Sequence, residues 1–123
     1  MAIRDTVSCA EELVIATISS GTSLSNSINL GGLRFFGFLM PSGWDAAALT
    51  VLASFDNGAT FVQMKSAYDG TEITYVVSPP GFYPLPNPQV LAAVAMLKIQ
   101  SGTSASPVNQ TADRVIQLVL RSI

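Results

Sequence analysis

The sequence predicts an all-β protein: a single antiparallel β-sandwich, jelly-roll-like, with about eight strands. Short runs of apolar and β-branched residues recur along the chain, separated by clusters of Gly, Pro, Asn, Asp and Ser. No long run has the 3.6-residue period of an amphipathic helix. The 123 residues suit one domain with its own core. An immunoglobulin-like Greek key is the second topology that fits the pattern.

Turn residues set the limits of the predicted strands. We expect strands at residues 12–19, 27–30, 33–40, 49–55, 61–65, 71–77, 93–101 and 114–122. A polar turn follows the first of them, and Gly31-Gly32 follows the second. The third, LRFFGFLM, is the most aromatic, and Pro41-Ser42-Gly43 ends it.

The fourth predicted strand has apolar residues on alternate positions. Its first face is predicted to carry Leu49, Val51, Ala53 and Phe55. The apolar Leu52 interrupts the alternation. We therefore expect this strand to be covered on both sides.

The second half of the chain adds turns and a proline-rich crossing. Asp69-Gly70 precedes the strand at 71–77, and the prolines within residues 83–88 predict an extended, irregular change of sheet. Asn87 and Pro88 suit the N-cap and first position of a one-turn helix reaching about residue 92. A long polar loop, residues 102–113, precedes the last strand.

One hairpin carries a recognisable motif, SFDNGATF at residues 54–61. It resembles the Asp-box of sialidases and related glycan-active β-proteins, with Phe where Trp is usual at the last position. The resemblance implies that Ser54 and Asp56 bind backbone N–H groups inside the turn and that Thr60 helps to pack it. Gly58 is expected to have a positive φ. A single copy in so short a chain predicts the structural hairpin and no glycosidase.

Residues for catalysis or metal binding are scarce. The chain has no His and one Cys, Cys9, so neither a Ser-His-Asp triad nor a Cys-His pair can form. Most carboxylates lie at turns or strand ends, where Asp is common for capping reasons. Asp56 and Asp69 flank one hairpin and could share a Ca²⁺ ion, although calcium sites gather more ligands. We expect no catalytic residue, no cofactor and no metal.

Low charge is the most unusual feature of the composition. Charged residues make up 11%, against about 25% in ordinary soluble domains. The six Lys and Arg are scattered, so no nucleic-acid partner is expected. The apolar stretch at residues 90–97 is too short to span a membrane. Glu11 and Glu12 interrupt the N-terminal apolar run, so we expect no signal peptide. Much of the surface is predicted to face other protein subunits.

Aromatic residues outside the predicted core are candidates for such contacts. They are Trp44, Tyr68, Tyr75, Phe82 and Tyr83. They could form a platform for glycans, or they could seal the ends of the sandwich or a subunit contact. For the interface we favour Trp44, Phe82 and Tyr83, together with an N-terminal arm at residues 1–10 that reaches a neighbour.

Two long segments resemble a group of small phage and prophage virion proteins. They are NLGGLRFFGFLMPSGWDAAALTVLASFDNGATF at residues 29–61 and LKIQSGTSASPVNQTADRVIQLVLR at residues 97–121. Four features occur in the same order as in this group: the Gly-Gly strand, the Met-Pro followed by Trp, the DNG hairpin and the SGT…NQ.ADR loop. The resemblance implies a structural protein of a tailed phage with a β-sandwich fold, and it brings no catalytic residues.

Three functions therefore remain open from the sequence. The first is a non-enzymatic capsid cement or decoration protein, made in the host cytoplasm and located in the virion. Its expected partners are the phage major capsid protein and copies of itself in a homotrimer. The second is a glycan-binding module on the virion surface. The third is a minor tail or adaptor subunit.

Overall fold

The described residues form nine strands, the longer ones from the apolar runs, and turn residues separate them. The computed structural model describes residues 11–86, 91 and 94–122. Its strands are β1 (Glu11–Ile18), β2 (Ile28–Asn29), β3 (Arg34–Met40), β4 (Leu49–Ser54), β5 (Val62–Gln63), β6 (Thr74–Tyr75), β7 (Gly81–Pro84), β8 (Met96–Ser101) and β9 (Arg114–Arg121). The described residues contain no α-helix. The predicted all-β class is confirmed.

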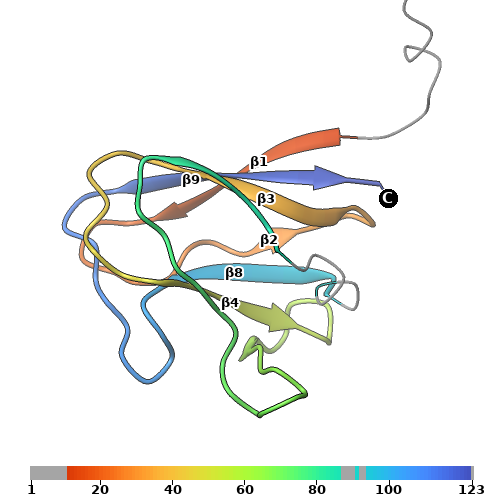
Figure 1. The fold of residues 1–123 in the computed structure, drawn as a ribbon. Coiled ribbons are helices and arrows are strands. Elements are labelled where there is room, and N and C mark those ends of the chain that lie inside the picture. The colour runs from red at the N-terminus through yellow and green to blue at the C-terminus, as the bar shows by residue number, and fades with distance from the viewer. Residues whose placement is uncertain (1–10, 87–90, 92–93, 123) are drawn as a thin grey trace, which may run out of the picture.

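The strands make two antiparallel sheets that pack as the layers of a sandwich (Figure 1). Sheet A has the order β1-β9-β3-β7. Sheet B has the order β2-β8-β4-β5, with β6 also paired to β4. Along the chain β1 to β4 alternate between the sheets, and β6 to β9 alternate again. This order is the double Greek key of a jelly roll, the first topology expected from the sequence.

Strand β7 was missed by the sequence prediction. The proline-rich segment is not simply irregular, because Gly81–Pro84 pairs with Gly37–Met40 of β3. β7 is an edge strand of sheet A, and an edge tolerates a proline since one side of its backbone has no neighbouring strand to bond. The crossing therefore changes sheet twice, from β6 in sheet B to β7 in sheet A and back to β8. The one-turn helix predicted for residues 87–92 falls, except for Leu91, outside the described residues.

The core lies between the inner faces of the two sheets. Its buried apolar residues are Ala16, Ile18, Ile28, Leu30, Phe35, Phe38, Met40, Leu49, Val51, Leu85, Leu91, Leu97, Ile99, Ile116, Leu118 and Leu120. Strand β4 is covered on both faces, as predicted: Thr50 and Ser54 on its outer side are also buried. The hydroxyl of Thr50 donates to the carbonyl of Gly102, 2.8 Å away, in the long polar loop. Phe55 does not join the predicted core face, because β4 ends at Ser54 and its ring is exposed.

A bulge in β3 decides which aromatic rings reach the core. Phe35 pairs with Leu120 of β9 and Gly37 with Val119, so Phe36 is an extra residue in the ladder. The bulge reverses the alternation, and both Phe35 and Phe38 are buried. Gly37 and Leu39 then point to the outer face of sheet A.

A polar cluster holds the long loop against one end of the sandwich. Gln110 is fully buried, and its Nε2 donates to the Ser101 hydroxyl at 2.8 Å. Its Oε1 accepts from the backbone N–H of Asp45 at 2.9 Å and from Nε of Arg114 at 3.1 Å. The Asp45 carboxylate accepts from the backbone N–H of Thr111 at 2.6 Å. The NQ.ADR motif of the sequence thus has a structural role.

Candidate functional site

The Asp-box-like hairpin uses its polar groups internally. The Ser54 hydroxyl accepts from the backbone N–H of Gly58 at 2.7 Å. The Asp56 carboxylate accepts from the Thr60 N–H at 2.8 Å and from the Ser54 hydroxyl at 2.9 Å. Gly58 has a φ of 94°, as predicted, and Asn57 one of 60°. The Thr60 N–H holds the pKa of Asp56 below its ordinary value, because it stabilises the charged carboxylate.

The neighbouring Asp69 is also occupied within its own turn. Its carboxylate accepts from the backbone N–H of Thr71 at 3.1 Å and from the Thr71 hydroxyl at 2.8 Å. These bonds lower the pKa of Asp69. Among the described residues, no group of three or more His, Cys, Asp or Glu side chains could hold a metal ion.

Two of the three predicted interface residues have roles inside the subunit. Trp44 packs against the core half-buried, and its Nε1 donates to the carbonyl of Ala47 at 3.1 Å. The ring of Tyr83 stacks on Phe38 with centroids 5.5 Å apart. The third, Phe82, is 54% exposed on the outer face of sheet A. Residues 1–10, the predicted arm, lie outside the described residues.

The outer face of sheet A is unusually apolar. We call its five exposed side chains, from all four strands, the apolar face: Leu13, Ile15, Leu39, Phe82 and Val115. The strand registers place Ile15 and Leu39 on either side of Gln117, and Leu39 beside Phe82, in one row across the sheet. In the next row, Leu13 lies beside Val119. These two rows carry no charged residue.

Sequence reasoning did not single out Leu13 and Ile15. Residues 13–16 are apolar at every position, so the pattern does not tell the inner face from the outer one. The structure places Ala16 and Ile18 in the core, and leaves Leu13 63% and Ile15 53% exposed. β1 has apolar residues on both faces, and this pattern could have indicated that a second surface of the strand is covered.

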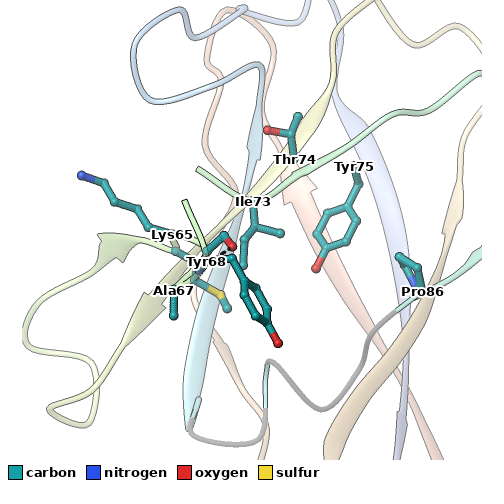
Figure 2. A pocket seen from close by; sticks show the side chains of 9 residues that line it. Lys65, Ala67, Tyr68, Ile73, Thr74, Tyr75 and Pro86 are labelled. Atoms are coloured by element: carbon teal, nitrogen blue, oxygen red, sulfur yellow. Dashed lines mark hydrogen bonds between the residues drawn. The ribbon is translucent and has the colours of Figure 1, made fainter. Parts of the chain in front are cut away.

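A second surface brings together two of the predicted aromatic residues, Tyr68 and Tyr75 (Figure 2). They line a hollow of about 420 Å³, which we call the tyrosine hollow. The other residues that line it are Met64, Lys65, Ser66, Ala67, Ile73, Thr74 and Pro86. Trp44 lines a separate hollow with Val76 and Pro79. The five candidate aromatics therefore do not form one platform.

The two tyrosines are held in different ways. Tyr75 lies on β6, and its ring meets Phe38 edge-on with centroids 6.2 Å apart. Burial raises the pKa of Tyr75. Tyr68 lies in the loop between β5 and β6 and its side chain is fully exposed. Its backbone N–H donates to the Ser66 hydroxyl at 3.1 Å, so the loop that presents it is ordered by its own hydrogen bonds.

Comparisons with protein-family models, curated protein sequences and solved structures gave no significant match. Within the part of the chain that the structure describes, no helix is long and apolar enough to cross a membrane.

Proposed function

We propose that the chain is a non-enzymatic structural protein of a tailed-phage virion, a capsid cement or decoration subunit. It forms a homotrimer through the apolar face, and the trimer docks on the phage major capsid protein. The apolar face is the observation that carries this proposal. The sequence resemblance to phage virion proteins supports the location, and a minor tail or adaptor subunit is the nearest alternative.

The apolar face is suited to contact with another copy of the chain. Full burial of a Leu, Ile, Val or Phe side chain contributes roughly 1.5–3 kcal/mol, and these side chains are about half exposed in the single subunit. Each therefore retains about 1 kcal/mol to be gained from a partner. Because the two central rows carry no charge, neighbouring copies around a three-fold axis can cover them without burying an unpaired charge. Exposed apolar patches of this kind mark interaction sites on soluble proteins.

Strand β1 adds a backbone edge to this face. The backbone N–H of Thr17 donates to the Asn26 side chain at 2.8 Å, away from β9. Backbone groups alternate in direction along a strand, so those of Leu13 and Ile15 also point to the open edge of sheet A. At these two residues a neighbouring copy would meet exposed side chains and edge backbone together.

The described acidic residues support a structural role. Asp56 and Asp69 accept hydrogen bonds from backbone N–H groups of their own turns, and Asp45 accepts one from Thr111 in the long polar loop. A cement protein stabilises a capsid because it binds the assembled shell and not its dissociated subunits, which shifts assembly by RT ln(1 + [L]/Kd) at each site. Many symmetric copies multiply a modest energy per site.

The experiment is to add the purified chain to empty tailed-phage capsids that lack a decoration protein. We expect it to cosediment with the capsids at a saturating ratio and to raise their melting temperature. A chain that stays in the supernatant at high micromolar concentration would contradict the cement role. Binding to purified tails instead would favour the adaptor alternative.

A further inference from the structure

We propose that the tyrosine hollow binds a neutral carbohydrate. This site is separate from the apolar face and goes beyond the structural role proposed above. The hollow lies at sheet B, where the loop between β5 and β6 meets β6 and the segment at Pro86. Its volume of about 420 Å³ is within the range of roughly 300–1,000 Å³ that is usual for small-molecule sites.

Two aromatic rings are presented to the same space. In Figure 2 the rings of Tyr68 and Tyr75 point in the same direction, with Ile73 between their attachment points and Pro86 beyond Tyr75. The C–H groups of a sugar ring carry slight positive charge and pack on the negative face of an aromatic ring. Tyr68 is fully exposed, so one ring is available for such a contact without any rearrangement.

Hydrogen bonds within the loop that carries Tyr68 hold the loop in one conformation. Ser66 and Thr71 bracket it: the Ser66 N–H donates to the Thr71 carbonyl at 2.8 Å, and the Gly70 N–H donates to the Ser66 carbonyl at 2.8 Å. Asp69 bonds to both the N–H and the hydroxyl of Thr71. A loop fixed by this many hydrogen bonds holds its tyrosine in place before a ligand arrives, which lowers the entropy cost of binding.

Polar groups around the hollow suit hydroxyl-rich ligands. Neither tyrosine hydroxyl has a hydrogen-bond partner within the described residues, and each can donate one bond and accept others. The Tyr75 ring is half-buried, yet Figure 2 shows its oxygen directed away from the strand into the open space. No buried side-chain oxygen of the described residues lacks a partner, so the Tyr75 oxygen is open to solvent, where a ligand hydroxyl can replace water.

The charge around the hollow favours a neutral ligand. Lys65 is the only charged residue among the described residues that line it, and Figure 2 shows its ammonium group pointing away from both rings. A phosphate or carboxylate ligand would have no cation beside the tyrosines. A neutral sugar needs only aromatic faces and hydroxyl partners, which the hollow supplies.

The test begins with a printed array of neutral mono- and oligosaccharides, followed by titration calorimetry with the sugars that bind. We expect Tyr68→Ala to weaken binding about tenfold and Tyr68→Phe to weaken it less, since the ring is kept. Phe55→Ala is the matched control, because Phe55 is also an exposed aromatic, 76% accessible, on a different loop. It should bind like the unmodified chain.

Three results would overturn the carbohydrate site: no sugar bound on the array, equal binding by Tyr68→Ala, or equal loss in Phe55→Ala. Binding of a proline-rich or apolar peptide in place of any sugar would overturn it as well. Light scattering of Tyr68→Ala separates this outcome from the structural proposal. The variant should keep the oligomeric state of the unmodified chain, since Tyr68 does not belong to the apolar face.

Discussion

Phe82 lies directly over Gly37 on the outer face of sheet A. A Cβ atom placed on Gly37 would be 2.8 Å from Cζ of the Phe82 ring and 3.1 Å from the carbonyl oxygen of Tyr83. The absence of a side chain at Gly37 thus lets the ring of an edge strand lie across its neighbour. This contact makes Phe82 part of a continuous apolar face.

The contact predicts that Gly37 and Phe82 are energetically coupled. Gly37→Ala should lower the free energy of unfolding by about 1 kcal/mol, because the new methyl group displaces the ring and crowds the Tyr83 carbonyl. In a Phe82→Ala background the same change should cost less, since the ring is gone. A double-mutant cycle measured by urea unfolding checks this. Strictly additive effects would show that the ring does not rest on Gly37.

A second prediction compares two glycines of similar backbone conformation. Gly102 and Gly21 have φ of +85° and +80°. A Cβ on Gly102 would be 2.5 Å from the backbone oxygen of Ser106 and 2.8 Å from the N of Val108, whereas nothing lies within 4 Å of one on Gly21. We expect Gly21→Ala to cost about 1–2 kcal/mol from backbone strain alone, and Gly102→Ala to cost at least about 3 kcal/mol. Equal melting temperatures would contradict this.

The hairpin predicts that removing the buried Ser54 hydroxyl lowers the free energy of unfolding. Ser54 is 1% exposed, and its oxygen accepts from the Gly58 N–H at 2.7 Å. Ser54→Ala leaves that N–H without its partner and should destabilise the chain by about 1 kcal/mol. Ser42→Ala, at an exposed serine, is the control and should have almost no effect. Urea unfolding of the two variants distinguishes them, and a stable Ser54→Ala would mean that the hydroxyl does not order the turn.

The stability of the chain should fall in acid partly through Asp45. The Thr111 N–H and the Arg114 guanidinium hold the pKa of Asp45 below its ordinary 3.8. A carboxyl whose pKa is lower in the folded state stabilises that state above pH 3.8. The contribution is lost as the pH falls through the folded pKa. Asp45→Asn should therefore flatten the loss of stability between about pH 5 and about pH 2. If Asp45→Asn loses stability with falling pH as the unmodified chain does, Asp45 does not cause the loss. Urea unfolding at several pH values measures this.

Strand positions and turns could be predicted because the signals are local. The turns at Gly31-Gly32 and Asn57-Gly58 have the positive φ that these residue types favour, and β2 and β4 end shortly before them. β7 could not be found in this way. Its pairing to β3 depends on the edge position in sheet A, where the fold, and not the local sequence, makes Pro84 tolerable.

The candidate sites were harder to predict, because they depend on distant parts of the chain. Tyr68 precedes β6 of sheet B and Pro86 follows β7 of sheet A, so the packing of the two sheets brings both to the hollow. Trp44 and Tyr83 are aromatic residues near turns, but only the fold shows that their rings pack on the subunit itself. Which face of β1 points outward depends on its register with β9.

The most direct test of the proposed role of the apolar face is the molar mass of the purified chain by light scattering. The unmodified chain should have three times the mass of one subunit at micromolar concentration. Ile15→Lys and Leu13→Lys place a charge on the face and should give monomers that remain folded by circular dichroism. Val76→Lys, at an 86% exposed residue outside the face, should stay trimeric. A monomeric unmodified chain, or trimers that survive both face substitutions, would contradict the account.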